Sequence, residues 1–125
     1  MASPQYETLT VELDGPVATV WLNRPERANS MNAQMWVDID DCFTWLDAHA
    51  HTRAIVLSGR GKHFCAGIDL DMLSALRVSG ERGRAGEQLR KTILRLQDNL
   101  TAIERCAKPV LAAIHSTCYG GGVDI

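Results

Sequence analysis

Two short segments combine glycine with a carboxylate, and both could form anion-binding turns. They are residues 64–70 (FCAGIDL) and residues 120–124 (GGGVD). Each follows an apolar run typical of a buried strand and leads toward a predicted helix. Glycine lets backbone N–H groups face outward, and a helix N-terminus adds unpaired donors. Two such donors directed at one point would stabilise an oxyanion, although the same turns are also common structural devices.

The side chains beside these turns include one candidate for proton transfer. Asp124, three residues after Gly121, could move a proton to or from a ligand. The alternative is a purely structural charge that stabilises the start of a helix by roughly 0.3–1 kcal/mol. His63 and His115 have no carboxylate or cysteine at ligand spacing, so we predict no metal site. Cys65 adjoins the first turn, but nothing marks it as a nucleophile.

Hydrophobic periodicity predicts the elements that must position these groups. Alternating residues predict a hairpin, apolar residues at three- and four-residue steps predict amphipathic helices, and short apolar runs predict buried strands. In chain order we predict strands at 8–13 and 17–22, a helix from Ser30 or Asn32 to Ala50, a strand at 53–58, a short helix at 68–76, a loop at 77–86, a helix at 87–106 and a strand at 110–114. Strands that alternate with helices indicate an α/β layer arrangement.

Composition limits the possible functions. The 125 residues suffice for one domain with a core, and the net charge of −2 argues against a general nucleic-acid binder. No apolar run approaches the ~18 residues of a membrane span. Four cysteines without a C-x-x-C pair, and no signal-peptide pattern, predict a cytoplasmic protein. The last residues, GGGVDI, carry no stop signal, so we expect a truncation inside a fold.

Four segments in order give the sequence its resemblance to a known family. They are Leu22-Asn23-Arg24-Pro25 with Asn29, the segment 58–70 (SGRGKHFCAGIDL), Lys108-Pro109-Val110, and Gly120-Gly121-Gly122. Together they resemble the enoyl-CoA hydratase/isomerase (crotonase) family. The resemblance implies a crotonase-like (ClpP/crotonase) α/β fold with a ββα-repeat spiral core. Residues 1–125 would be its N-terminal part, with the C-terminal part and trimerisation helices absent.

The resemblance also implies what the site binds. The substrate would be an acyl-CoA thioester, and an enolate-like intermediate would be held by the backbone amides of Ile68 and Gly121. Coenzyme A would be part of the substrate, so no cofactor is expected, and the full-length protein would be a homotrimer or hexamer that binds neither nucleic acid nor membranes. The residues assigned to substrate binding are Arg24, Arg27, Ala66, Gly67, Asp69, Leu70 and Gly122.

Two of these assignments have structural alternatives. The guanidinium groups of Arg24 and Arg27 suit the phosphates of CoA, but each could be a solvated surface charge. For Asp69 we favour a cap on the short helix that follows it.

Asp124 decides the subgroup. Hydratases of the family usually have Glu at this position, whereas dienoyl-CoA isomerases have Asp. The resemblance therefore implies conversion of 3,5-dienoyl-CoA to 2,4-dienoyl-CoA in fatty acid β-oxidation, with Asp124 as a catalytic residue. The partner acid–base groups would lie beyond Ile125. Enoyl-CoA hydration, or a non-catalytic truncated fragment that only binds acyl-CoA, remains the alternative.

Overall fold

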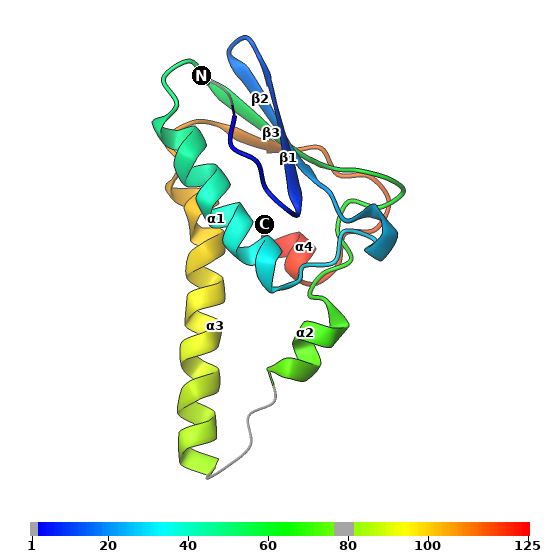
Figure 1. Ribbon diagram of the computed structural model, residues 1–125, viewed down its shortest axis with the longest axis vertical. Coiled ribbons are helices and arrows are strands. Elements are labelled where there is room, and N and C mark those ends of the chain that lie inside the picture. Colours follow the sequence, from blue (N-terminus) through cyan, green and yellow to red (C-terminus); the bar gives the residue numbers. More distant parts are fainter. Residues whose placement is uncertain (1–2, 77–81) are drawn as a thin grey trace.

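The computed structural model describes residues 3–76 and 82–125. Its elements are β1 (Leu9–Asp14), β2 (Val17–Leu22), a 3-10 turn η1 (Pro25–Arg27), α1 (Ala33–Ala48), β3 (Ala54–Gly59), α2 (Leu70–Ala75), α3 (Arg82–Arg105), β4 (Val110–Ala112) and α4 (Gly121–Asp124). Figure 1 shows the helices grouped beside and below a single sheet. The α/β arrangement predicted from the sequence is confirmed. None of the described helices is both long enough and apolar enough to cross a bilayer.

The sheet has the strand order β1-β2-β3-β4. β1 and β2 form the predicted antiparallel hairpin, whose turn uses Gly15 at a φ of +58°. β3 runs parallel to β2, and β4 runs parallel to β3. Parallel neighbours need long crossover connections, and here these contain α1 and the α2–α3 segment. The carboxyl ends of β3 and β4 therefore lead into the two glycine segments from the same edge of the sheet.

The core lies between the sheet and α1. Of the two predicted caps, Asn32 rather than Ser30 caps α1, because its side chain accepts a hydrogen bond from the amide of Met35 at 2.9 Å. One face of α1 is buried and meets apolar side chains of the strands. The largest fully buried apolar side chains are Phe43, Phe64, Leu22, Met31, Met35, Ile39, Leu46, Ile55, Leu57 and Val20.

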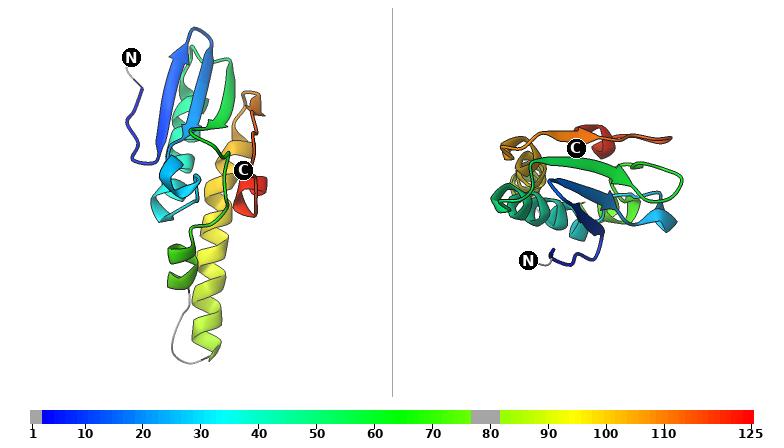
Figure 2. Two further views of the ribbon diagram at one scale, coloured as in Figure 1. Left: turned by 90° about the vertical axis from the view of Figure 1, so that its right-hand side faces the viewer. Right: turned by 90° about the horizontal axis from the view of Figure 1, so that it is seen from above.

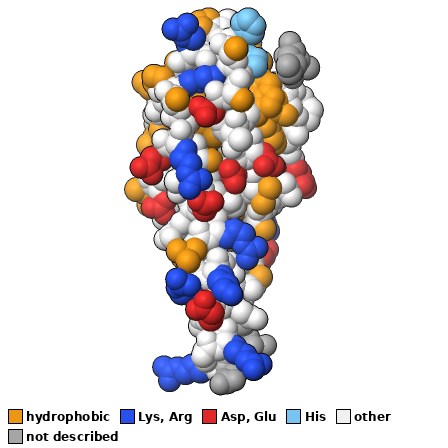
Figure 3. Space-filling model, turned by 90° about the vertical axis from the view of Figure 1, so that its left-hand side faces the viewer, with side chains coloured by type: hydrophobic (Ala, Val, Ile, Leu, Met, Phe, Trp, Pro, Cys, Tyr) orange, Lys and Arg blue, Asp and Glu red, His pale blue; other side chains and the backbone are white. Residues whose placement is uncertain are grey.

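Helix α3 differs from the prediction at its start. It begins at Arg82 rather than near residue 87, so the predicted loop at 77–86 is helical from residue 82, while residues 77–81 lie outside the described residues. Gly83 and Gly86 lowered the helical signal, but both face open space and fit an exposed helix. The first half of α3 extends away from the sheet (Figure 2), and Lys and Arg side chains gather at this narrow end (Figure 3).

The last strand also differs from the prediction. We expected a buried strand at 110–114, but β4 is an edge strand of three residues. Leu111 is 59% exposed and Ile114 is 56% exposed, so the prediction of burial is wrong. An apolar run indicates that other elements can pack on the strand, but none of the described residues covers Leu111 and Ile114. The carboxyl ends of β3 and β4 nonetheless remain adjacent in the sheet.

Candidate active site

The structure brings the two glycine turns together. Cys65 and Cys118 form an isolated parallel β-bridge, in which the Cys65 amide donates to the Thr117 carbonyl at 3.0 Å. The Tyr119 amide then donates to the Cys65 carbonyl, also at 3.0 Å. A Cβ atom placed on Gly67 would lie 3.5 Å from the Gly121 nitrogen. The two predicted anion-binding turns therefore meet at Gly67 and Gly121.

The peptide geometry sets the direction of the Ile68 amide. Met31 donates its amide to the Gly67 carbonyl at 2.7 Å and accepts the Asp69 amide at 3.0 Å. In a trans peptide the N–H points opposite to the C=O of the same unit, and the described residues contain no cis bond. Since the Gly67 carbonyl points at Met31, the Ile68 N–H points away from it. The Ile68 nitrogen lies 3.8 Å from the position of a Cβ on Gly121.

The Gly121 amide belongs to the first residue of α4. Gly120, at a φ of +49°, turns the chain, after which Gly122 donates to the Tyr119 carbonyl at 2.7 Å. A Cβ on Gly122 would lie 2.8 Å from the Cys65 carbonyl oxygen, so only glycine allows this approach. Neither the Ile68 amide nor the Gly121 amide donates a hydrogen bond to another described residue. Two backbone donors that lie close together without a protein partner are available to a ligand.

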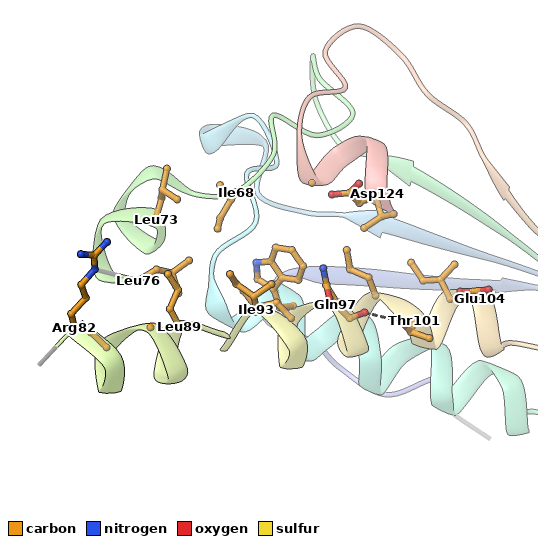
Figure 4. Close-up of a pocket in the computed structure, with 18 residues that line it drawn as sticks. Ile68, Leu73, Leu76, Arg82, Leu89, Ile93, Gln97, Thr101, Glu104 and Asp124 are labelled. Carbon is orange, nitrogen blue, oxygen red and sulfur yellow. Dashed lines mark hydrogen bonds between the residues drawn. The ribbon is translucent and has the colours of Figure 1, made fainter. Parts of the chain in front are cut away.

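Both unpaired amides border one large cavity. It has a volume of about 1250 Å³ and is lined mainly by apolar side chains of α3, together with Trp36, Leu73, Leu76 and Ile125. Figure 4 shows Ile68 and Asp124 on one side of this cavity and Ile93 and Thr101 of α3 on the other. A carboxylate and two backbone donors therefore open onto the same apolar space. Such a space suits a ligand with a carbonyl group and a hydrocarbon chain.

The far part of the cavity lies between α2 and α3. Leu73, Leu76 and Leu89 line it, and Arg82 stands at its end (Figure 4). The side chains of α3 that face it are partly exposed, with Ile93 at 42%. The apolar stripe of α3 faces the cavity, and Leu96, Leu100 and Ile103 within it also pack against the core.

A second, smaller depression also borders the first turn. It has a volume of about 530 Å³ and is lined by Glu26, Arg27, Ser30, Ala66, Ile68, Asp69, Leu70 and Asp71. Four residues predicted to bind substrate are among these, namely Arg27, Ala66, Asp69 and Leu70. Arg27 is 55% exposed at its side chain and pairs with Asp71 at 3.2 Å. Ile68 borders both the large cavity and this depression.

Arg24 and Asp69, both predicted to bind substrate, form an ion pair with each other. The Arg24 side chain is only 13% exposed and borders neither cavity, so it is not a solvated surface charge. Its guanidinium donates to the Asp69 carboxylate at 3.3 Å. Asp69 caps α2, as predicted, through bonds from the amides of Asp71 at 2.9 Å and Met72 at 3.3 Å.

The surroundings of Asp69 lower the pKa of its carboxyl group. Burial alone raises this pKa, but the backbone amides of Met72 and Asp71 and the guanidinium of Arg24 stabilise the charged form more strongly. Asp69 is therefore ionised in the folded protein. Burial raises the pKa of the Cys65 thiol, which agrees with a structural rather than a nucleophilic cysteine.

Asn29 is a connecting residue to which sequence reasoning assigned no structural role. It is fully buried, accepts the Arg24 amide at 2.8 Å, and donates to the Arg60 and His63 carbonyls at 2.8 Å each. Its φ is +53°, in the left-handed region that asparagine tolerates better than most residues. The only signal in the sequence was an asparagine in a polar loop, because the two carbonyls that accept its side-chain amide are more than thirty residues away. Within the described part of the chain, no three His, Cys, Asp or Glu side chains could hold a metal ion.

Comparison with known proteins places this geometry in context. The family model described as "Enoyl-CoA hydratase/isomerase" matches residues 12–125. The peroxisomal Delta(3,5)-Delta(2,4)-dienoyl-CoA isomerase of Arabidopsis thaliana is 41% identical, covering 100% of this chain and 48% of the relative. The mitochondrial Delta(3,5)-Delta(2,4)-dienoyl-CoA isomerase of Homo sapiens is 46% identical, covering 96% of this chain and 38% of the relative. The chain thus spans less than half the length of these relatives.

A solved structure supports the same fold. The crystal structure of an enoyl-CoA hydratase/isomerase from Xanthobacter autotrophicus Py2 superposes with a TM-score of 0.83 at 28% identity, covering 96% of this chain and 43% of that one. The crotonase-like fold expected from the sequence is therefore confirmed. The expected cytoplasmic location is contradicted, because these relatives are peroxisomal and mitochondrial proteins.

Proposed function

This chain belongs to the enoyl-CoA hydratase/isomerase family, and from that premise we propose that the whole protein converts 3,5-dienoyl-CoA to 2,4-dienoyl-CoA. One observation carries the proposal. The unpaired amides of Ile68 and Gly121 and the carboxylate of Asp124 border the same apolar cavity. This combination suits a reaction in which a thioester oxygen gains charge while a proton leaves the adjacent carbon.

The proposed reaction moves one proton along the acyl chain. A proton leaves C2 and another arrives at C6, so both double bonds shift one carbon toward the thioester. Between these steps the negative charge is shared between the chain and the thioester oxygen. The amides of Ile68 and Gly121 would donate to that oxygen as an oxyanion hole. Fixed donors need no reorganisation as the charge forms, and the loss of one typically costs about 3 kcal/mol of transition-state stabilisation.

Asp124 is the proposed group for one of the two proton transfers. It follows Gly121 by three residues and borders the cavity from α4. Because one proton leaves C2 and another is added at C6, the reaction needs a second acid–base group at the other end of the diene. We propose that this group lies in the part of the whole protein that corresponds to the remaining length of the relatives. The reaction needs no cofactor beyond the CoA of the substrate.

The two cavities suggest how the substrate lies. The acyl chain would occupy the large apolar cavity between α2 and α3. The CoA moiety would lie over the smaller depression, where Arg27 is exposed and can meet a phosphate. Ile68 borders both spaces, so the thioester would sit between them. We further propose that the full-length protein is a homotrimer or hexamer, which light scattering would measure.

A turnover assay with a substitution at Asp124 tests the proposal. The 2,4-diene is conjugated with the thioester and absorbs at longer wavelength than the 3,5-diene, so isomerisation can be followed directly. Asp124→Asn should lower kcat at least a hundredfold while the affinity for the CoA ester stays within about threefold. Asp98→Asn, on the exposed side of α3, is the matched control and should turn over at the wild-type rate.

Two outcomes would overturn this function. Unchanged turnover in Asp124→Asn would remove Asp124 from the mechanism. If the wild-type protein instead hydrated crotonyl-CoA and left 3,5-dienoyl-CoA untouched, the hydratase alternative would replace the isomerase.

A further inference from the structure

The hydrogen bonds of the Asp69 carboxylate account for all of its acceptor capacity inside the protein. One oxygen accepts the amides of Asp71 and Met72 at 2.9 and 3.3 Å. The other accepts both terminal nitrogens of Arg24 at 3.3 Å, and the Ser30 hydroxyl at 3.4 Å. The Asp69 side chain is 9% exposed. With these bonds made, Asp69 has little capacity left for a ligand.

Arg24 is held by hydrogen bonds to Ser30, in the loop that Asp69 also contacts. One nitrogen of its guanidinium also donates to the Ser30 carbonyl and, at 3.3 Å, to the Ser30 hydroxyl. Its backbone amide donates to the buried side chain of Asn29 at 2.8 Å. The guanidinium is only 13% exposed, and these bonds hold both of its terminal nitrogens on the side of Asp69 and Ser30. The exposed neighbour Arg27 has no such restriction.

Asp69 directly follows Ile68 in the chain, and this adjacency links the ion pair to the site. The backbone from Gly67 to Asp69 is bonded to Met31 at both ends, through the Gly67 carbonyl and the Asp69 amide. Met31 belongs to the loop that the hydrogen bonds between Arg24 and Ser30 hold in place. The ion pair therefore joins the two segments whose relative position sets the direction of the Ile68 N–H.

We propose that Arg24 and Asp69 are positioning residues that act through the Ile68 amide, rather than substrate-binding residues. This inference rests on the proposed role of that amide as a donor to the thioester oxygen. The pair holds residues 67–69 against Met31 so that the Ile68 N–H points into the large cavity. A displacement of about 1 Å at a reacting group can cost a hundredfold in rate.

The experiment uses Asp69→Asn and Arg24→Lys in the intact protein. Asparagine keeps an acceptor for the α2 cap but loses the charge that holds Arg24, and lysine keeps the charge but loses the two-nitrogen contact. Asp98→Asn is the matched control, because Asp98 forms an exposed ion pair with Arg105 at 2.8 Å away from both cavities. Circular dichroism confirms that each variant is folded. If Asp69→Asn does not fold, Arg24→Lys alone decides.

The main measurement compares the affinities of two ligands that differ only in the thioester carbonyl oxygen. Saturated acyl-CoA has the thioester carbonyl, whereas the matching S-alkyl-CoA thioether lacks it. We expect both variants to weaken thioester binding roughly tenfold and to leave thioether binding unchanged. We also expect kcat to fall by tenfold to a hundredfold, and KM for the dienoyl-CoA thioester to rise by about as much as the thioester affinity falls. The control should match the wild type in all four quantities.

Three results would overturn the inference. Equal weakening of both ligands would mean that Arg24 or Asp69 contacts the CoA moiety directly. Unchanged thioester affinity and kcat would mean that the Arg24–Asp69 pair does not set the direction of the Ile68 amide. If the wild type bound the thioether as tightly as the thioester, the Ile68 amide would not donate to the thioester carbonyl. The binding comparison does not depend on the reaction, so a wild type that prefers the thioester but does not isomerise dienes would refute only the proposed function.

Discussion

The two turns that meet at the candidate site are held in place by different means. The first turn, at residues 65–69, is buried at Cys65, Gly67 and Asp69, and charged and polar side chains such as Arg24 and Asn29 tie it to a neighbouring loop. The second turn, at residues 118–124, is largely exposed, with Tyr119 at 68% and Val123 at 67%. It is held by backbone hydrogen bonds and by the close approach of Gly122 to Cys65.

This difference shows two ways to fix the direction of a backbone amide. Around Ile68 the protein adds side chains whose bonds depend on charge to the backbone hydrogen bonds with Met31. Around Gly121 it uses the absence of side chains, so that two segments of backbone can touch. The first turn should therefore respond to changes of charge, and the second to an added methyl group.

The largest effect should come from Gly122→Ala. A Cβ there would lie 2.8 Å from the Cys65 carbonyl oxygen and 2.9 Å from the Cys65 Cβ, so backbone must move. Overpacking of this kind costs about 1–3 kcal/mol of unfolding free energy, and the displaced turn should also lower kcat. Urea unfolding and the diene assay measure both quantities.

The matched control for this substitution is Gly86→Ala. Gly86 lies in α3 with open space around it, so alanine should stabilise the helix by up to about 1 kcal/mol. If Gly122→Ala were as stable as Gly86→Ala, the close contact between the two turns would not constrain the site.

An intermediate effect should follow from protonation of Asp69. Its pKa in the folded protein is held below the unfolded value of about 3.9, so the carboxylate contributes stability above that pH. The contribution is lost as pH falls through the lower folded pKa. The stability advantage of the wild type over Asp69→Asn should therefore shrink below about pH 4. Urea midpoints of both proteins between neutral and strongly acid pH test this, and a difference that stays constant would contradict it.

The smallest effect should come from Gly121→Ala. The nearest atom to its added Cβ is the Met31 sulfur at 3.0 Å, which belongs to a flexible side chain. We expect the free energy of unfolding to change by less than about 1 kcal/mol, since a helical alanine offsets part of the crowding. A loss as large as that of Gly122→Ala would show that the second turn is constrained along its whole length.

Local patterns predicted most of the fold. The hairpin of β1 and β2, the cap of α1 at Asn32 and the cap of α2 at Asp69 all follow from alternation and from short-range hydrogen bonds. The start of α3 was missed because two glycines and several charges resemble a loop. The exposure of β4 was missed because an apolar run does not reveal which neighbours will cover it.

The candidate site was predictable only in part. Glycine turns, a following carboxylate and the family resemblance identified the segments and residues. Their contact could not be derived, because it depends on the bridge between Cys65 and Cys118, which are far apart in the sequence. The Arg24–Asp69 pair likewise joins positions 45 residues apart. Neither residue type nor spacing distinguishes it from the exposed pair of Arg27 and Asp71, which joins the same two segments.

A crystal structure of the whole protein with a bound dienoyl-CoA analogue tests the central claim most directly. We predict that the thioester oxygen lies about 2.7–3.1 Å from the amide nitrogens of both Ile68 and Gly121, with the acyl chain running past Asp124. An oxygen that contacts neither nitrogen, or an amide already bonded to a protein acceptor in the complex, would contradict the account.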